Sequence, residues 1–241
     1  MSFQEKIIEG KYNYYQGDQV YCEETFSVFK EDGSHGRIIF NAELTSRVET
    51  GEFLKVLVDY KLSKKFEPLN LKVKRLLGGS KSVERYVVDL KDKNVRYTFR
   101  GTDGIHETEK IITGKFHIAA PAFSTTMLAT AAKKLDPVHR TSYNIISSSN
   151  VWEYEGPFKE SEIFIELSSL EPVPIFVGDT ELQATHCKVF EDDKARNPNT
   201  KGYSIYLSKH YQIPYKAVFA DDIQIEVQNL KNFETEYKDL F

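Results

Sequence analysis

The chain has 241 residues, of which 40% are hydrophobic and 28% are charged, as expected for a globular protein with a substantial core. Nucleic-acid binding requires a basic stripe, whereas this chain has a net charge of −4. Nucleic acid is therefore not expected as a partner. Two cysteines, Cys22 and Cys187, are too few for a disulfide scaffold at this size. They are predicted to be free buried thiols, although a single bridge between them stays open.

The first residues, MSFQEKIIEG, lack the basic and long apolar regions of a signal peptide. No stretch approaches the ~20 apolar residues of a membrane-spanning helix, so no integral membrane association is expected. The sequence as written therefore predicts a soluble, cytoplasmic protein. A periplasmic location remains the alternative if an exported protein has been trimmed.

Alternation of apolar and polar residues dominates the first half of the chain. Between residues 54 and 62, the apolar side chains of Leu54, Val56, Val58, Tyr60 and Leu62 oppose Lys55, Asp59 and Lys61. Period-two patterns of this kind predict strands whose sheet has one apolar and one wet face. By this criterion strands are expected near 6–16, 19–30, 37–49, 53–65, 71–77, 83–91, 94–101 and 104–113.

Turn-forming residues separate these strands. Gly17-Asp18, Thr50-Gly51-Glu52, Asp92-Lys93-Asn94 and Asp103-Gly104 each fit a tight connection. Short connections make neighbouring strands antiparallel, and long twisted strands favour a curved sheet over a flat one.

The pattern changes to helical spacing between residues 121 and 135. Phe123, Met127, Leu128, Ala131 and Leu135 would share one face, with a proline on either side of the segment. One main helix is therefore expected near 121–135, lying on the concave face of the sheet.

Strand-like patterns then resume and continue almost to the end. Strands are expected near 139–147, 150–155, 162–168, 173–178, 181–191, 202–208, 214–219 and 222–230. The polar stretch 192–201 is predicted to be a loop. The fold class is therefore all-β: a single domain over 1–241, built as a long-stranded antiparallel curved sheet or unclosed barrel.

Some short motifs add a family resemblance. The first group of motifs is the run Phe66-Glu67-Pro68-Leu69 before a strand, followed by 82–89 and 95–99. The second consists of the later runs 178–190, 203–208 and 213–216. In these two groups of motifs the chain resembles uncharacterised bacterial relatives of the lipoprotein-localisation-factor (LolA/LolB-like) superfamily. The resemblance implies an unclosed β-barrel with an apolar concave face, plugged by helices, that can hold acyl chains. It departs from the carriers in having no signal peptide or lipobox cysteine.

Aromatic residues are the candidates for a ligand-binding wall, because 14 Tyr and 16 Phe are present. Phe and Tyr can line an apolar pocket while a phenol anchors a polar group, although strands also favour these residues without any ligand. The ligand-binding candidates, including two from the helical segment, are Tyr12, Tyr14, Phe123, Met127, Tyr206 and Tyr215.

Histidines are the catalytic candidates, and the three nominated are His117, His186 and His210. None of the six histidines has the spacing of a metal pair, so no metal and no cofactor is expected. The carboxylate pairs Glu153/Glu155 and Glu160/Glu162 fit solvated strand edges. Gly78-Gly79-Ser80-Lys81 lacks the phosphate-loop spacing and fits a bend between strands.

These patterns favour binding of a hydrophobic small molecule or lipid, because one helix covers only part of the apolar face that so many strands present. One alternative is an isomerase, lyase or hydratase acting on an apolar substrate in the same cavity. It would need a buried acid or base with a perturbed pKa. Another is a structural or interaction module without a ligand, using a sheet edge.

Overall fold

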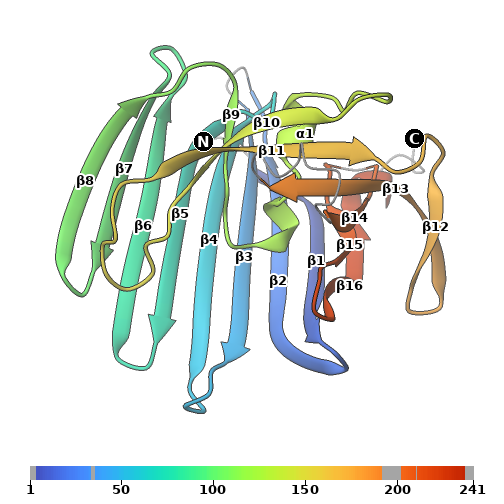
Figure 1. The fold of residues 1–241 in the computed structure, drawn as a ribbon, viewed down its shortest axis with the longest axis horizontal. Coiled ribbons are helices and arrows are strands. Elements are labelled where there is room, and N and C mark those ends of the chain that lie inside the picture. The colour runs from blue at the N-terminus through green and yellow to red at the C-terminus, as the bar shows by residue number, and fades with distance from the viewer. Residues whose placement is uncertain (1–3, 34–35, 192–201, 210, 237–241) are drawn as a thin grey trace.

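The computed structural model describes residues 4–33, 36–191, 202–209 and 211–236. Within these ranges one sheet of sixteen strands dominates the protein (Figure 1). The predicted all-β, unclosed architecture is therefore confirmed. The strands are β1 (Gln4–Gln16), β2 (Gln19–Glu31), β3 (Arg37–Arg47), β4 (Phe53–Ser63), β5 (Pro68–Leu77), β6 (Ser80–Asp89), β7 (Asn94–Gly101), β8 (Gly104–Ile111), β9 (Phe116–Ile118), β10 (Thr141–Ser147), β11 (Lys159–Leu167), β12 (Val173–Val177), β13 (Thr180–Glu191), β14 (Tyr203–Leu207), β15 (Pro214–Val218) and β16 (Ile223–Asn232).

Two successive runs of strands, β1–β8 and β9–β16, form one sheet because the first strand, β1, pairs with the last, β16. The strand order is β8-β7-β6-β5-β4-β3-β2-β1-β16-β15-β14-β13-β11-β10-β9, with β12 paired to β13 outside this path. Pairing is antiparallel except between β9 and β10, which are parallel. The predicted tight hairpins at Asp92-Lys93-Asn94 and Asp103-Gly104 are present, and Gly78-Gly79 forms the turn between β5 and β6.

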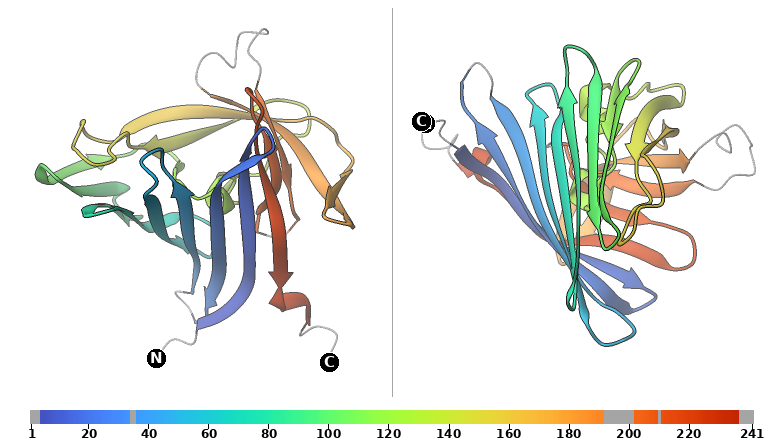
Figure 2. Two further views of the ribbon diagram at one scale, coloured as in Figure 1. Left: turned by 90° about the horizontal axis from the view of Figure 1, so that it is seen from below. Right: turned by 90° about the vertical axis from the view of Figure 1, so that its left-hand side faces the viewer.

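The sheet curls back over itself without closing. Strands β10, β11 and β13 cross the concave face of the early strands at a large angle to them (Figures 1 and 2). Strand β9 comes close to β5 but makes no strand pairing with it. Between β9 and β5 there is thus a seam with no main-chain ladder, and β6, β7 and β8 extend beyond it.

The core lies between these two parts of the sheet. On β4 the alternating side chains Val56, Val58, Tyr60 and Leu62 are buried, as the period-two pattern predicts. Several of the largest side chains in this core are fully buried tyrosines and phenylalanines, namely Tyr12, Tyr60, Tyr86, Tyr97, Phe40 and Phe99. Cys22 and Cys187 are both buried and free, as expected.

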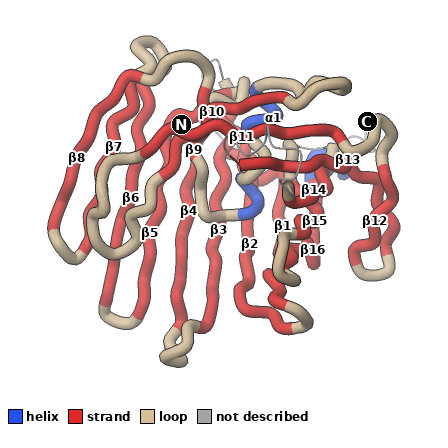
Figure 3. The backbone as a smooth tube through the Cα atoms, viewed as in Figure 1, coloured by secondary structure: helices blue, strands red, loops and turns tan. Residues whose placement is uncertain are grey.

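The single helix predicted near 121–135 is wrong in extent. A 3₁₀ turn, η1 (Phe123–Thr125), and a four-residue helix, α1 (Ala129–Ala132), replace it (Figure 3). The hydroxyls of Thr125 and Thr130 donate to the carbonyls of Ala122 and Met127, an interaction that competes with regular helical bonding. Phe123, Met127 and Leu128 are nevertheless buried, so the predicted apolar face does pack against the sheet.

One other predicted strand is absent, two short elements were not predicted, and two predicted features cannot be compared. Residues 150–155 form bends and irregular backbone instead of a strand, and the parallel strand β9 was not expected. A second short helix, α2 (Phe233–Glu236), follows β16. The polar loop predicted at 192–201 and His210 lie outside the described residues.

Candidate functional site

Three hollows, which we call the seam hollows, lie along β9: the first opens at the seam between β9 and β5, and the other two lie on the β10 side of β9. The largest, of about 610 Å³, lies between the β4–β5 turn, the β6–β7 turn and the start of β9. A second, of about 290 Å³, shares Lys115, Phe116 and Ala132 with the first. A third, of about 410 Å³, shares His117 with the second. The three hollows therefore adjoin one another along a single short strand.

The largest hollow combines an apolar wall with a charged rim. Its apolar lining consists of Phe66, Pro68, Leu90, Phe116, Ala131 and Ala132. Its charged lining consists of Lys64, Lys65, Lys93, Lys115 and Glu67. Ligand pockets are typically about 300–1,000 Å³ and mostly apolar with a few convergent polar groups, and this hollow has those properties.

His117 lies between the second and third hollows, and it is almost fully buried. Its ring nitrogens lie 3.3 and 3.4 Å from the Tyr60 hydroxyl, which also accepts a hydrogen bond from the Ile118 amide at 3.2 Å. Burial lowers the pKa of His117 to about 3, and a hydrogen bond with the Thr125 backbone opposes that shift. The imidazole is therefore neutral at pH 7 and joins β9 to β4 and to η1.

A buried carboxylate holds η1 against the sheet. Glu24 Oε2 accepts hydrogen bonds from the Tyr14 hydroxyl at 2.5 Å and from the Phe123 amide at 2.7 Å. Its Oε1 accepts one from the Ser124 amide at 3.1 Å. Burial raises the pKa of Glu24, while these donors oppose the rise. Because Glu24 binds the backbone of η1 and lines none of the three hollows, we assign it to positioning the segment that follows β9.

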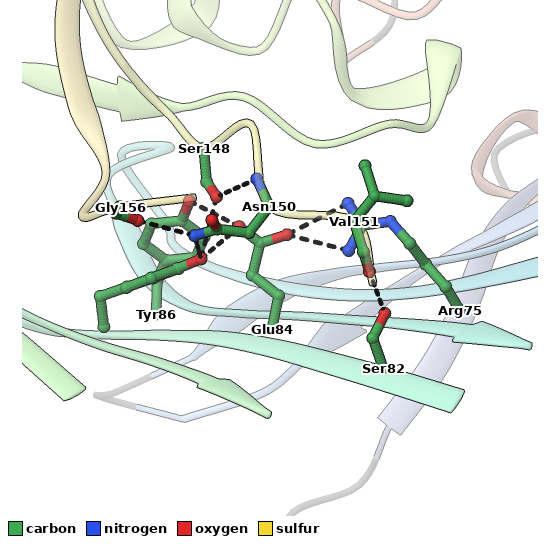
Figure 4. Close-up of polar contacts among 9 residues, drawn as sticks. Arg75, Ser82, Glu84, Tyr86, Ser148, Asn150, Val151 and Gly156 are labelled. Carbon is green, nitrogen blue, oxygen red and sulfur yellow. Dashed lines mark hydrogen bonds and ion pairs between the residues drawn. The ribbon is translucent and has the colours of Figure 1, made fainter. Parts of the chain in front are cut away.

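A second buried carboxylate, Glu84, lies on the inner face of β6 (Figure 4). Its Oε2 accepts from both terminal nitrogens of Arg75 at 3.1 Å, and its Oε1 accepts from the Tyr86 hydroxyl at 2.9 Å and the Tyr97 hydroxyl at 3.2 Å. Burial, followed by the charge of Glu84, raises the pKa of Tyr86. Glu84 lines none of the three seam hollows, so we assign this network a structural role.

The network continues into the segment between β10 and β11 through Asn150. The Asn150 side chain donates to the Tyr97 hydroxyl at 2.7 Å and to the Gly156 carbonyl at 2.9 Å, and it accepts from the Glu155 amide at 2.6 Å. Further along, Phe158 packs on Tyr86 and Tyr97. This segment therefore covers the inner face of the strands that extend beyond the seam.

We expect Asn150→Ala to lower the free energy of unfolding by about 2 to 3 kcal/mol, since it removes three hydrogen bonds, one to the Tyr97 hydroxyl on β7 and two within the segment between β10 and β11. Urea titration followed by circular dichroism would measure the change. Asn229→Ala is the matched control, because Asn229 is exposed on β16, and it should change stability by less than about 0.5 kcal/mol. Equal effects of the two changes would contradict the role assigned to Asn150.

The aromatic residues nominated from sequence occupy two different places. Tyr12, Tyr14, Phe123 and Met127 are buried together where η1 meets the sheet, with ring centroids of Tyr12 and Phe123 5.0 Å apart. Tyr215 is buried on β15. Tyr206 is half-buried and stacks on His186, with centroids 4.5 Å apart. Of the nine nominated residues, His117 alone lines a seam hollow within the described part of the chain.

Sequence analysis did not find Glu24, Glu84 or the lysines around the largest hollow. A signal for the carboxylates was present, since Glu24 is in register with Cys22, Phe26 and Val28, which are all buried. A charged residue on the apolar side of an alternating strand is a candidate for a buried, hydrogen-bonded group. The lysines belong to three separate connections, and no local pattern links them.

The described residues contain neither a metal centre nor a membrane-spanning helix. No group of three or more His, Cys, Asp or Glu side chains there could hold a metal ion. None of the helices described is long and apolar enough to cross a membrane.

Comparison with known proteins adds a likeness of fold. No family model matches the chain, and no curated protein matches it. Among solved structures, the chain is similar to a β-barrel-like protein of the domain of unknown function DUF1849 from Brucella abortus, with a TM-score of 0.50 and 7% sequence identity over 95% of this chain and 98% of that chain. At this identity the similarity shows the fold alone. That protein is bacterial and of unknown function, as the expected resemblance implied, but the comparison does not show a link to the LolA/LolB-like superfamily.

Proposed function

We propose that the protein binds a hydrophobic small molecule or lipid in the hollows along β9. The observation that carries this proposal is the chain of three adjoining hollows along β9, the largest of which opens at the seam where β9 and β5 do not pair. An apolar ligand there would remove the faces of Phe66, Leu90 and Phe116 from water. Each buried CH₂ of such a ligand contributes about 0.8 kcal/mol.

The sequence resemblance to the lipoprotein-localisation-factor superfamily supports the same proposal. It implies an unclosed barrel that holds acyl chains on its concave side. Here most of that side is filled by the core and by the segment after β9, so the space for a ligand lies at the seam. We therefore place the ligand beside Phe116 and Ala132, away from the buried tyrosines Tyr12 and Tyr14.

The enzymatic alternative depends on His117, because His186 lines none of the seam hollows and His210 is outside the described residues. A base with a pKa of about 3 accepts protons poorly at neutral pH. The His117 ring is also held between Tyr60 and the backbone near η1. Binding is therefore the function that this geometry supports best.

A side chain that fills the largest hollow should weaken binding. Ala132 lines the first and second hollows and is half-buried, so Ala132→Trp would place an indole in the ligand's space. We expect this change to weaken binding of diphenylhexatriene, a neutral apolar probe, by at least about tenfold, or about 1.4 kcal/mol. Fluorescence titration would measure it, and native mass spectrometry would look for a co-purified ligand in the unmodified protein.

Ala220→Trp is the matched control, because Ala220 is exposed in the turn between β15 and β16 and lines none of the three hollows. It should leave probe binding unchanged. Failure of the unmodified protein to bind any apolar probe would overturn the proposed function, as would equal binding by the two variants.

A further inference from the structure

We propose that the largest hollow selects ligands whose apolar chain ends in an anionic oxyanion group, a carboxylate or a phosphate. The proposal rests on the proposed function and names the class of ligand for the same site. It is carried by the convergence of four lysines on the rim of an otherwise apolar hollow. These are Lys64, Lys65, Lys93 and Lys115.

The lysines reach the rim from three connections that are distant in sequence. Lys64 and Lys65 lie in the turn between β4 and β5, Lys93 in the turn between β6 and β7, and Lys115 directly before β9. All four are exposed, and the Lys64 ammonium donates to the Gly33 carbonyl at 2.8 Å. Four points of positive charge therefore surround one opening.

Little negative charge offsets them. In the part of the chain that the structure describes, none of the four lysines forms an ion pair with a carboxylate. Glu67 is the one acidic residue in the lining, and its Oε2 accepts a hydrogen bond from the Ser63 hydroxyl at 3.2 Å. Four lysines and one glutamate give the lining a formal charge of +3, in a chain whose net charge is −4.

Phe66, which forms part of the apolar wall beside this rim, has an unusual backbone conformation. Phe66 has a φ of +61°, a region that bulky residues rarely adopt. The Ser63 carbonyl accepts from the Phe66 amide at 2.9 Å, and the Ser63 hydroxyl accepts from the amides of Lys65 and Glu67, both at 3.2 Å. Ser63 thus fixes the turn that presents two rim lysines and the Phe66 ring together.

This arrangement matches an amphiphile better than a neutral apolar molecule or a bare anion. Lysine ammonium groups bind phosphate and carboxylate as point charges. Each exposed pair contributes little, so selectivity requires several lysines at once and should weaken as salt screens them. The wall formed by Phe66, Leu90 and Phe116 would hold the chain, which could extend past Phe116 into the adjoining hollow.

The test compares ligands that share one chain and differ in head group. Calorimetric titration of the full chain with dodecyl phosphate, dodecanoate, dodecanol and inorganic phosphate, all below their aggregation concentrations, would measure each dissociation constant. At low ionic strength we expect both anionic amphiphiles to bind roughly tenfold more tightly than dodecanol. That preference should fall when salt is added, and inorganic phosphate alone should bind at least about a hundredfold more weakly than dodecyl phosphate.

A variant that removes the rim charge separates selectivity from apolar binding. The combined change of Lys64, Lys65, Lys93 and Lys115 to Gln should remove the preference for anionic ligands and leave dodecanol affinity within about twofold. The control replaces Lys72, Lys81, Lys91 and Lys159 with Gln, which makes the same change in total charge. These four lysines are exposed and line none of the seam hollows.

The outcomes distinguish this proposal from the one it rests on. If dodecanol and the anionic amphiphiles bind equally, or both quadruple variants lose the preference alike, the lysine rim does not select and this inference fails alone. If inorganic phosphate binds as tightly as dodecyl phosphate, the ligand is a small anion and this inference also fails. If no chain-bearing ligand binds at all, the proposed function fails with it.

Discussion

Glu24→Ala should lower the free energy of unfolding by about 3 to 5 kcal/mol, the largest effect that we expect from a single substitution in this protein. The change removes the carboxylate that accepts from the Tyr14 hydroxyl and from the amides of Phe123 and Ser124. The Tyr14 hydroxyl and the Ser124 amide would stay buried without this acceptor, and the Phe123 amide would keep only its 3.2 Å bond to the Tyr14 hydroxyl, because η1 packs in the core at this point. Urea unfolding at pH 7, followed by circular dichroism, would measure the loss.

Two further variants show whether hydrogen bonding is the cause. Glu24→Gln keeps the shape of the side chain but places an amide NH₂ against one of the donors, so it should still cost about 1 to 3 kcal/mol. Glu23→Ala alters the neighbouring exposed position, where the side chain pairs with Lys11 at 2.7 Å, and should cost less than about 1 kcal/mol. A Glu24→Ala protein as stable as Glu23→Ala would refute the role assigned to this carboxylate.

The sheet could be predicted from sequence because its strands are regular and their connections are short. Alternation on β4 places Val56, Val58 and Tyr60 on one side, and the structure buries them. Asp103-Gly104 closes a hairpin whose glycine has a φ of +122°, which suits glycine better than any residue with a side chain. Local pattern and local turn chemistry determine these elements, and both can be read without knowing the fold.

The segment after β9 could not be predicted because its shape depends on distant partners. The apolar residues Phe123, Met127 and Leu128 have helical spacing, and they are buried as that spacing suggests. However, the amides of Phe123 and Ser124 bond to Glu24 on β2, and the segment leaves helical geometry after a few residues. Tertiary hydrogen bonds therefore override the local preference here.

The candidate site could not be predicted from the sequence for a similar reason. Lys64, Lys93 and Lys115 come together only because β9 lies beside β5, and β9 is a three-residue parallel strand without a recognisable pattern. The nominated tyrosines were read from strand composition, which cannot distinguish a core side chain from one that lines a hollow. The strands could be placed along the sequence, but the seam between two of them depends on how the sheet curls.

Stability should fall as the pH is lowered from 7 to 5, and His117 should account for about 2 kcal/mol of that loss. Burial lowers the pKa of His117 to about 3 in the folded protein, whereas an unfolded histidine titrates near 6.5. Between these two values the unfolded chain binds the proton and the folded chain does not. The stability that depends on a neutral His117 is therefore fully present above about pH 6.5. It is lost at about 1.4 kcal/mol per pH unit as the pH falls toward 3.

The measurement is a series of urea titrations from pH 7.5 to 5, with His117→Gln compared against the unmodified protein. Gln cannot titrate, so the variant should lose this part of the pH dependence even if it is less stable at every pH. His186, whose pKa is also lowered by burial, acts in the same direction in both proteins and cancels in the difference. Parallel curves for His117→Gln and the unmodified protein would show that this imidazole is not held neutral in the seam.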